Sequence, residues 1–236
     1  MSKARPWACI TTCILTIISA LILLIASSVY TNRSYYLRNY WGVLFAFSIW
    51  SIIVSCLGLI AAIGLAYVAF RRFPALTTLF SGLLVAAVLL SIICIIVLFI
   101  NRANVRTKST RETGFLMADY VSTDLRKNSK SVMDTVQETY QCCGADQALN
   151  WATIFSDGKS TPDSCCHIVT PGCGNSSLVS QTNIYIRGCV EPVASHYRQQ
   201  YSILIGLNFN FILFALVSAV LGLIFERYIR EQYQMM

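Results

Sequence analysis

The chain has 236 residues, of which 56% are hydrophobic and only 12% are charged, and its formal net charge is +7 at pH 7. Soluble globular domains carry about 25% charged residues, so this composition excludes an ordinary soluble domain and favours an integral membrane protein. The positive charge does not indicate nucleic-acid binding, because the sequence has no basic stripe with interleaved aromatic residues. No enzyme is expected either, since neither of the two histidines has a paired nucleophile in its sequence context.

Four long apolar segments are predicted to cross the membrane as helices: residues 9–30, 42–70, 75–100 and 203–225. A span needs roughly 20 apolar residues to cross a hydrocarbon core of about 30 Å, and each segment is long enough. None of the four contains a charged residue or a histidine. The first exceeds the roughly 7–15-residue apolar region of a signal peptide, so it is interpreted as a span. The predicted fold class is an all-α integral membrane protein with four transmembrane helices.

Basic residues beside the spans predict the orientation, because cytosolic loops carry an excess of Lys and Arg. Residues 1–8, 71–74 and 226–236 are therefore assigned to the cytosol, which places both termini there. The basic residues in these three segments are Lys3, Arg5, Arg71, Arg72, Arg227 and Arg230. Residues 31–41 then form a small extracellular loop, and residues 101–202 form a large one.

The large loop is expected to begin and end with helices. Its first part repeats apolar residues at three-, four- and seven-residue steps, which is typical of an amphipathic helix. The residues on this face are Ala118, Val121, Leu125, Val132, Val136 and Tyr140. The helix of the third span is expected to continue into this region, with a break near Gly114. Pro192 suits the first turn of a second helix that leads directly into the fourth span.

Between these helices, residues 144–188 are rich in Gly, Pro, Ser, Thr and Asn and have too little apolar surface to order on their own. Disulfide bonds between cysteines are expected to hold this segment in a fixed conformation. Six of the ten fall in the large loop: Cys142, Cys143, Cys165, Cys166, Cys173 and Cys189. An even number of cysteines in an outward-facing loop indicates disulfides in an oxidising compartment. A zinc site is disfavoured, because the spacings do not repeat a two-ligand knuckle and His167 is the only nearby histidine.

Two adjacent cysteines cannot easily bond to each other, so each is expected to form a disulfide with a different, non-adjacent cysteine. A bond between Cys142 and Cys189 would clamp the two helices together and leave Cys143 free to tether the irregular segment. Gly144 would let the chain turn sharply beside them. The second adjacent pair, at residues 165–166, would repeat this division. Six cysteines allow many pairings, however, and the sequence alone does not choose between them.

These motifs resemble those of the tetraspanin family, and the resemblance covers the whole chain. The matching residues are Cys142, Cys143, Gly144, Pro162, Ser164 and Cys165, with the later pairs Gly172-Cys173 and Gly188-Cys189. A cysteine-cysteine-glycine triplet alone is modest support, but the second cluster and the order of a small and then a large outer loop make the match specific. Residues 162–174 and the ending YQMM are most similar to the late-endosomal, lysosome-associated branch of the family.

The resemblance implies three disulfides, Cys142–Cys189, Cys143–Cys165 and Cys166–Cys173. It also implies a membrane scaffold that binds client membrane proteins laterally and through its large loop, and that organises membrane microdomains and trafficking. The implied partners are other membrane proteins, the protein itself or other tetraspanins, and membrane lipids that include cholesterol. The implied locations are the plasma membrane and the late endosome or lysosome.

Residues 144–188 are the predicted partner-binding part, because loops held by rigid elements commonly carry binding residues. The apolar candidates for partner contact are Trp151, Ile154, Phe155, Ile184 and Tyr185. The competing interpretation is that these side chains pack against the helical stalk beneath a solvated cap.

Three further motifs concern trafficking and modification. Tyr233 and Met236 form a C-terminal pattern that can add as a short strand to a clathrin adaptor. Sequons for N-glycosylation begin at Asn32 and Asn175, and Asn175 is the better candidate because Asn32 lies close to the bilayer. Candidates for S-palmitoylation near the cytosolic end of the first span are Cys9 and Cys13.

Asn208 and Asn210 are the most polar groups of the predicted spans. Interhelical hydrogen bonding is their expected role, and Asn208 is also a candidate to line an internal lipid pocket. No intramembrane charge marks an ion or proton path, which disfavours an ion channel. The alternative function is a lipid- or sterol-binding or transport-type four-helix protein. No cofactor is expected, and the expected ligand of this alternative is a sterol or another lipid. A claudin-like barrier protein is disfavoured because its large loop comes first.

Overall fold

The computed structural model describes residues 4–34, 42–71, 74–121 and 129–234. The elements in chain order are α1 (Ala4–Ser34), α2 (Gly42–Arg71), α3 (Pro74–Ala103), α4 (Val105–Ala118), α5 (Ser129–Tyr140), the 3-10 helices η1 (Ala148–Thr153) and η2 (Asp163–Cys165), α6 (Ser177–Ser180) and α7 (Val190–Gln234). Within these residues the only extended pairing consists of two isolated β-bridges. The predicted all-α membrane fold is therefore confirmed.

The chain divides into two compact units. The membrane unit comprises residues 1–38, 42–100 and 201–236, and the loop unit comprises residues 39–41 and 101–200. Helix α7 supplies residues to both units, as expected for a helix that runs from the last cysteine of the loop into the fourth span.

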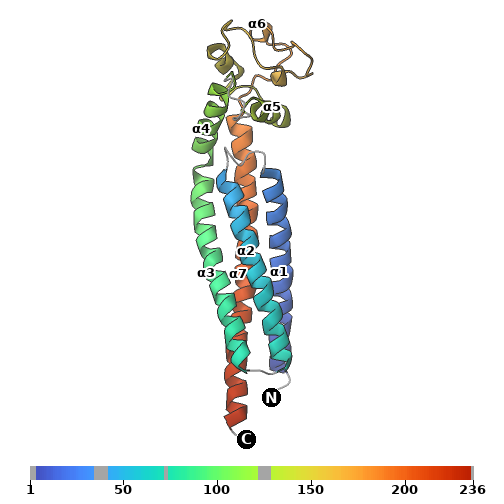
Figure 1. Cartoon of the computed structure of the whole chain (residues 1–236), viewed down its shortest axis with the longest axis vertical. Coiled ribbons are helices and arrows are strands. Elements are labelled where there is room, and N and C mark those ends of the chain that lie inside the picture. The colour runs from blue at the N-terminus through green and yellow to red at the C-terminus, as the bar shows by residue number, and fades with distance from the viewer. Residues whose placement is uncertain (1–3, 35–41, 72–73, 122–128, 235–236) are drawn as a thin grey trace. The chain divides into compact units, whose positions relative to one another are not determined.

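In the membrane unit, α1, α2, α3 and the C-terminal part of α7 run side by side (Figure 1), and all four helices are long and apolar enough to cross a membrane. Each predicted span lies within one of these helices. The start of α1 and the end of α7 lie at the same end of this bundle (Figure 1), which an even number of spans requires. Which end faces the cytosol stays a prediction from the basic residues.

Small residues allow the helices of the membrane unit to approach closely. A Cβ atom at Gly58 would lie 2.5 Å from the ring of Phe211, and one at Gly222 would lie 2.5 Å from Oγ of Ser81. These contacts join α2 and α3 to α7, so a larger residue at either glycine would require the facing side chain or its helix to shift. Large apolar side chains cover the outside of the bundle, which is the distribution expected of a protein surrounded by lipid.

The helix break expected near Gly114 lies ten residues earlier, at Asn104, between α3 and α4. Gly114 itself is inside α4, where a Cβ atom would meet no other atom within 4 Å. The first part of the expected apolar face was also wrong, because Ala118, the last residue of α4, is exposed, and Val121, which follows the helix, is 58% exposed. The residues that α4 buries are Val105, Ser109, Thr113, Leu116 and Met117. Two of these are small polar residues, and an apolar periodicity does not detect a face that contains them.

The predicted face of α5 fits better. Val132 and Val136 are buried, as expected, together with Met133 and Gln137. Tyr140 is half-buried at the end of the helix. The remaining member of the predicted face, Leu125, lies outside the described residues.

Candidate functional site in the large loop

Three disulfides hold the loop unit together: Cys142–Cys189, Cys143–Cys165 and Cys166–Cys173. This is the pairing that the family resemblance implies. The first bond joins the end of α5 to the residue before α7, and the other two hold residues 143–173 to this junction. All six sulfur-bearing residues except Cys173 are buried, so the bonds form the interior of the irregular segment.

Two glycines permit the tight crossing of the backbone at this junction. Gly144 has φ +73°, and a Cβ atom there would lie 2.2 Å from the carbonyl oxygen of Gln147. A Cβ atom at Gly188 would lie 2.2 Å from the carbonyl oxygen of Ala145. The close approach allows the N–H groups of Cys189 and of the following residue to donate to the carbonyl oxygens of residues 144 and 145, at 3.0 and 3.1 Å. The glycine of the family triplet is thus required by the geometry of the crossing.

A buried polar network fixes the irregular segment onto α5. The Asp134 carboxylate accepts hydrogen bonds from the Tyr120 hydroxyl at 2.9 Å and from Ser164 Oγ at 2.7 Å. The amide group of Gln137 donates to Ser164 Oγ, and its oxygen accepts from the indole nitrogen of Trp151 at 3.1 Å. Burial raises the pKa of Tyr120 well above its usual value, and the Asp134 carboxylate adds to this effect. Ser164 therefore links η2 to α5.

Asp163, which precedes Ser164 in η2, has a separate role. The Asp163 carboxylate accepts hydrogen bonds from the backbone N–H groups of Gly172 at 2.9 Å and Gly174 at 2.8 Å. It thereby holds the turn that carries Cys173 against η2. This role of Asp163 could not be predicted from the sequence, because its partners lie nine and eleven residues further along the chain.

Two of the predicted partner-contact residues are in the wrong place for that role. Trp151 is fully buried and Ile184 is 2% exposed, so neither can meet a partner in this structure. Trp151 packs edge-on against Tyr120 at 4.9 Å between ring centroids. Both residues are therefore interior residues of the loop unit. The contact of Trp151 with Tyr120 agrees with the competing interpretation, in which these side chains pack inward instead of meeting a partner. The other three candidates, Ile154, Phe155 and Tyr185, are half-buried.

The exposed apolar side chains of the irregular segment are different residues. The exposed apolar set comprises Leu149, Ile168, Val169, Val179 and Ile186, which are 52% to 72% exposed. Apolar side chains at this level of exposure on an otherwise rigid surface are candidates for partner contact. These residues could not be picked out from the sequence, because their neighbours include buried as well as exposed apolar residues, such as Leu178 beside Val179 and Ile184 near Ile186.

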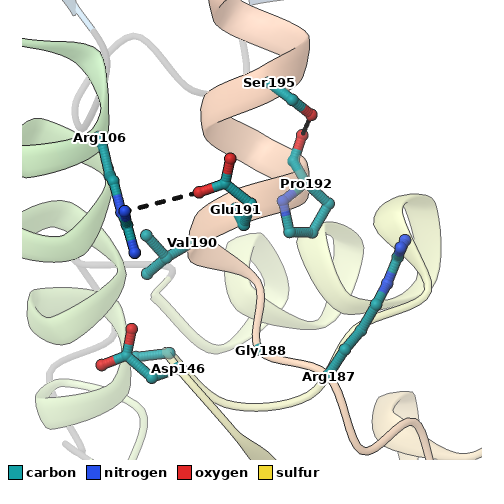
Figure 2. Close-up of a pocket in the computed structure, with 9 residues that line it drawn as sticks. Arg106, Asp146, Arg187, Gly188, Val190, Glu191, Pro192 and Ser195 are labelled. Atoms are coloured by element: carbon teal, nitrogen blue, oxygen red, sulfur yellow. Dashed lines mark hydrogen bonds and ion pairs between the residues drawn. The ribbon is translucent and has the colours of Figure 1, made fainter.

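The loop unit also contains a pocket of about 520 Å³ (Figure 2). Its lining residues are Arg106, Ala145, Asp146, Arg187, Gly188, Val190, Glu191, Pro192 and Ser195. Arg106 and Glu191 form an exposed ion pair at 3.7 Å, which contributes at most about 1 kcal/mol. Arg187 instead donates to the carbonyl oxygens of Tyr140 at 2.8 Å and Gln141 at 3.2 Å and so caps the end of α5. The pocket has charges of both signs and suits a polar segment better than an apolar ligand.

The remaining predicted sites lie as follows. Asn175 is exposed in a turn, and Asn32 is exposed in the last turns of α1. Asn208 is fully buried, and its amide donates to the carbonyl oxygen of Leu204 at 2.9 Å, whereas Asn210 is exposed. Tyr233 belongs to helix α7, but its side chain, like the whole of Met236, lies outside the described residues.

The prediction of palmitoylation at Cys9 and Cys13 conflicts with the structure. Their side chains are 1% and 0% exposed and belong to the buried core of the bundle. The pair lies four residues apart on the inner face of α1, the helix whose Thr16 hydrogen-bonds to Ser218 of α7 at 2.8 Å. An acyl group cannot be attached to either thiol in this conformation.

These features define a class of protein: four membrane-spanning helices with a disulfide-bonded loop domain between the third and the fourth. No group of three or more His, Cys, Asp or Glu side chains that could hold a metal occurs within the described ranges. The model of the tetraspanin family matches residues 7–227, and the chain belongs to the tetraspanin family.

Individual relatives are more distant. The chain is 26% identical to the CD63 antigen of Bos taurus over 138 residues, which are 58% of this chain and 56% of the relative. It is 29% identical to the CD63 antigen of Homo sapiens over 110 residues, 46% of this chain and 45% of the relative. It is 28% identical to Tetraspanin-9 of Salmo salar over 102 residues, 43% and 41% of the two chains. The matches thus span about half the length of these relatives.

Proposed function

We propose that this multi-pass membrane protein is a scaffold that binds client membrane proteins through the exposed apolar set of its large loop and through its membrane helices. The observation that carries the proposal is the combination of a segment held by three disulfides and a polar network with five well-exposed apolar side chains. A rigid surface loses little conformational entropy on binding, so exposed apolar area there favours association. Organisation of membrane microdomains and assembly with other tetraspanins follow from the same lateral contacts.

Affinity capture of the full chain in a mild detergent tests this function. Residues 144–188 would be replaced by an unrelated disulfide-bonded segment, with the helices unchanged. The proposal expects stoichiometric membrane proteins with the native chain and their loss with the replaced segment. Capture of the same partners by both chains would place recognition in the helices or lipids instead.

The proposal extends to trafficking between the plasma membrane and late endosomes or lysosomes. Its support is the similarity of residues 162–174 and of the ending YQMM to the late-endosomal branch. Tyr233 and Met236 would bind a clathrin adaptor, with both termini in the cytosol. An unchanged ratio of surface to internal protein in a Tyr233→Ala variant would contradict this role, whereas a shift toward the surface is expected.

A second candidate function is the binding of a sterol or another neutral lipid within the membrane unit. The observation that favours it is Asn208, whose Oδ1 is buried without a hydrogen-bond partner among the described residues. A lipid hydroxyl group would satisfy that oxygen, because buried polar atoms normally have a partner. Photo-crosslinking with a cholesterol analogue in vesicles would label residues near Asn208 if this function holds, and an Asn208→Leu variant would lose the label.

A further inference from the structure

Within the membrane unit, α7 has two opposite faces. On each face, the residues recur at alternating steps of three and four along the sequence. The inner face is buried and consists of Leu204, Asn208, Phe211, Ala215, Ser218, Gly222 and Phe225. The second face, called the outer seam, is exposed and consists of Ile203, Gly206, Asn210, Leu213, Val217, Val220 and Ile224. In a spanning helix the outer seam faces lipid or another protein. Each face contains one asparagine.

Asn210 is the unusual residue of the outer seam. Its position is seven residues from Ile203, so it lies about 10 Å along the helix from the start of the apolar segment. The side chain is exposed, and it makes no hydrogen bond to any described residue. A short carboxamide at this depth cannot reach water, and an unsatisfied polar group in hydrocarbon is costly. The amide therefore requires a partner from outside the chain.

Gly206 lies one turn before Asn210 on the same face. A Cβ atom there would meet nothing within 4 Å, in contrast to Gly58 and Gly222, where it would collide with a neighbouring helix. Packing inside the chain thus gives no reason for a glycine at this position, although glycine costs helix stability. The glycine does leave a hollow next to the carboxamide, and small residues at such places allow another helix to approach closely.

The residue pattern of the outer seam indicates which kind of helix would pack against it. With Asn210 at an a position of a heptad, the other a positions hold β-branched residues, and the d positions hold Gly206, Leu213 and Val220. The a positions are Ile203, Asn210, Val217 and Ile224. β-Branched residues at a favour parallel two-stranded association where d is leucine, which here holds at Leu213, and a single asparagine at a fixes the register.

A second copy of this chain satisfies these requirements. Two copies inserted with the same orientation carry Asn210 at the same depth. A carboxamide has both donors and an acceptor, so two of them can pair across a two-fold axis. We propose that the outer seam of α7 is a self-association interface in which Asn210 of each copy hydrogen-bonds to Asn210 of the other. The inference deepens the scaffold function proposed above and rests on it, because it supplies the contact between like molecules.

The test measures dimerisation of the full chain in phosphatidylcholine vesicles by energy transfer, as a function of the protein-to-lipid ratio. Asn210→Leu is expected to weaken dimerisation roughly 3- to 30-fold, the range typical of interhelical hydrogen bonds in membranes. Asn210→Gln keeps the amide and should stay within about threefold of the native constant. Leu216→Ala, on an exposed face beside the seam, should have the same small effect. A native-like constant for Asn210→Leu would overturn the proposal.

Disulfide cross-linking provides a second readout that does not depend on stability. In a chain whose exposed Cys56 is replaced by Ala, a Leu213→Cys variant should cross-link at least tenfold faster under copper phenanthroline than a Leu216→Cys variant. Equal rates at the two positions would contradict a seam-mediated dimer.

Client capture by the same variants separates the two proposals. Loss of dimers with capture intact supports the interface and the scaffold function together. An Asn210→Leu variant that keeps its dimers and loses clients would overturn self-association and make the seam a client surface. A native chain that captures no clients but forms Asn210-dependent dimers would remove the scaffold function and leave this interface standing.

Discussion

Replacement of Trp151 by Ala is expected to open the irregular segment of the loop unit without unfolding the membrane unit. The indole is fully buried, packs against Tyr120 and donates to Gln137. An aromatic side chain buries about 150–250 Å², which at about 25 cal/mol per Å² corresponds to roughly 4–6 kcal/mol as an upper bound. Measured costs of aromatic-to-alanine changes are about 3–5 kcal/mol, and Trp151→Ala is expected to lower the local stability of the segment by this amount.

Hydrogen exchange of the full chain, read by mass spectrometry, measures this opening directly. A local loss of about 3–5 kcal/mol corresponds to roughly 10²- to 4 × 10³-fold faster exchange for the amides of η1 and of residues 184–187. Leu149→Ala is the matched control, because Leu149 lies in the same 3-10 helix and is 54% exposed. Its effect should stay below about 0.5 kcal/mol. Less than tenfold acceleration for Trp151→Ala would refute the view that the indole holds the segment together.

Three further predictions concern single contacts. The raised pKa of Tyr120 means that the unfolded loop releases this proton near the usual value of 10.0 and the folded loop does not. Loop stability should therefore fall as the pH rises above about 10, and Tyr120→Phe should flatten this slope in a pH series of hydrogen exchange. Arg187→Ala removes the cap on the carbonyl oxygen of Tyr140 and should accelerate exchange at the end of α5 roughly 5- to 30-fold, whereas unchanged exchange would exclude a capping role. Asn175→Gln should increase electrophoretic mobility by one glycan in protein from a secretory host, and an unchanged mobility would show that the sequon is unused.

The spans could be predicted because a membrane helix needs only length and apolarity, and both can be read from the sequence. The face of α4 could not, because Ser109 and Thr113 form part of its contact surface. Small polar residues pack well between helices, yet they are absent from any pattern built on apolar residues.

The candidate site likewise contains some residues whose roles could be predicted from the sequence and others whose roles could not. The cysteines and Gly144 were identifiable because disulfides and positive φ angles restrict residue type strongly. Trp151 and Ile184 were misassigned as surface residues, since the composition of a polar segment does not reveal that its few large apolar side chains form a core of their own. The contacts of Asp163 depend on how the disulfides fold the chain back and therefore required coordinates.

The most direct test of the central claim is quantitative client capture by a variant of the exposed apolar set. Ile168→Ser, Val169→Ser and Ile186→Ser are combined in one chain, which leaves every buried residue of the segment unchanged. The control combines Phe115→Ser and Val121→Ser, which are similarly exposed and lie outside residues 144–188. The account predicts at least a tenfold loss of captured client for the first variant and native capture for the control. Equal capture by both variants and the native chain would contradict recognition through these side chains.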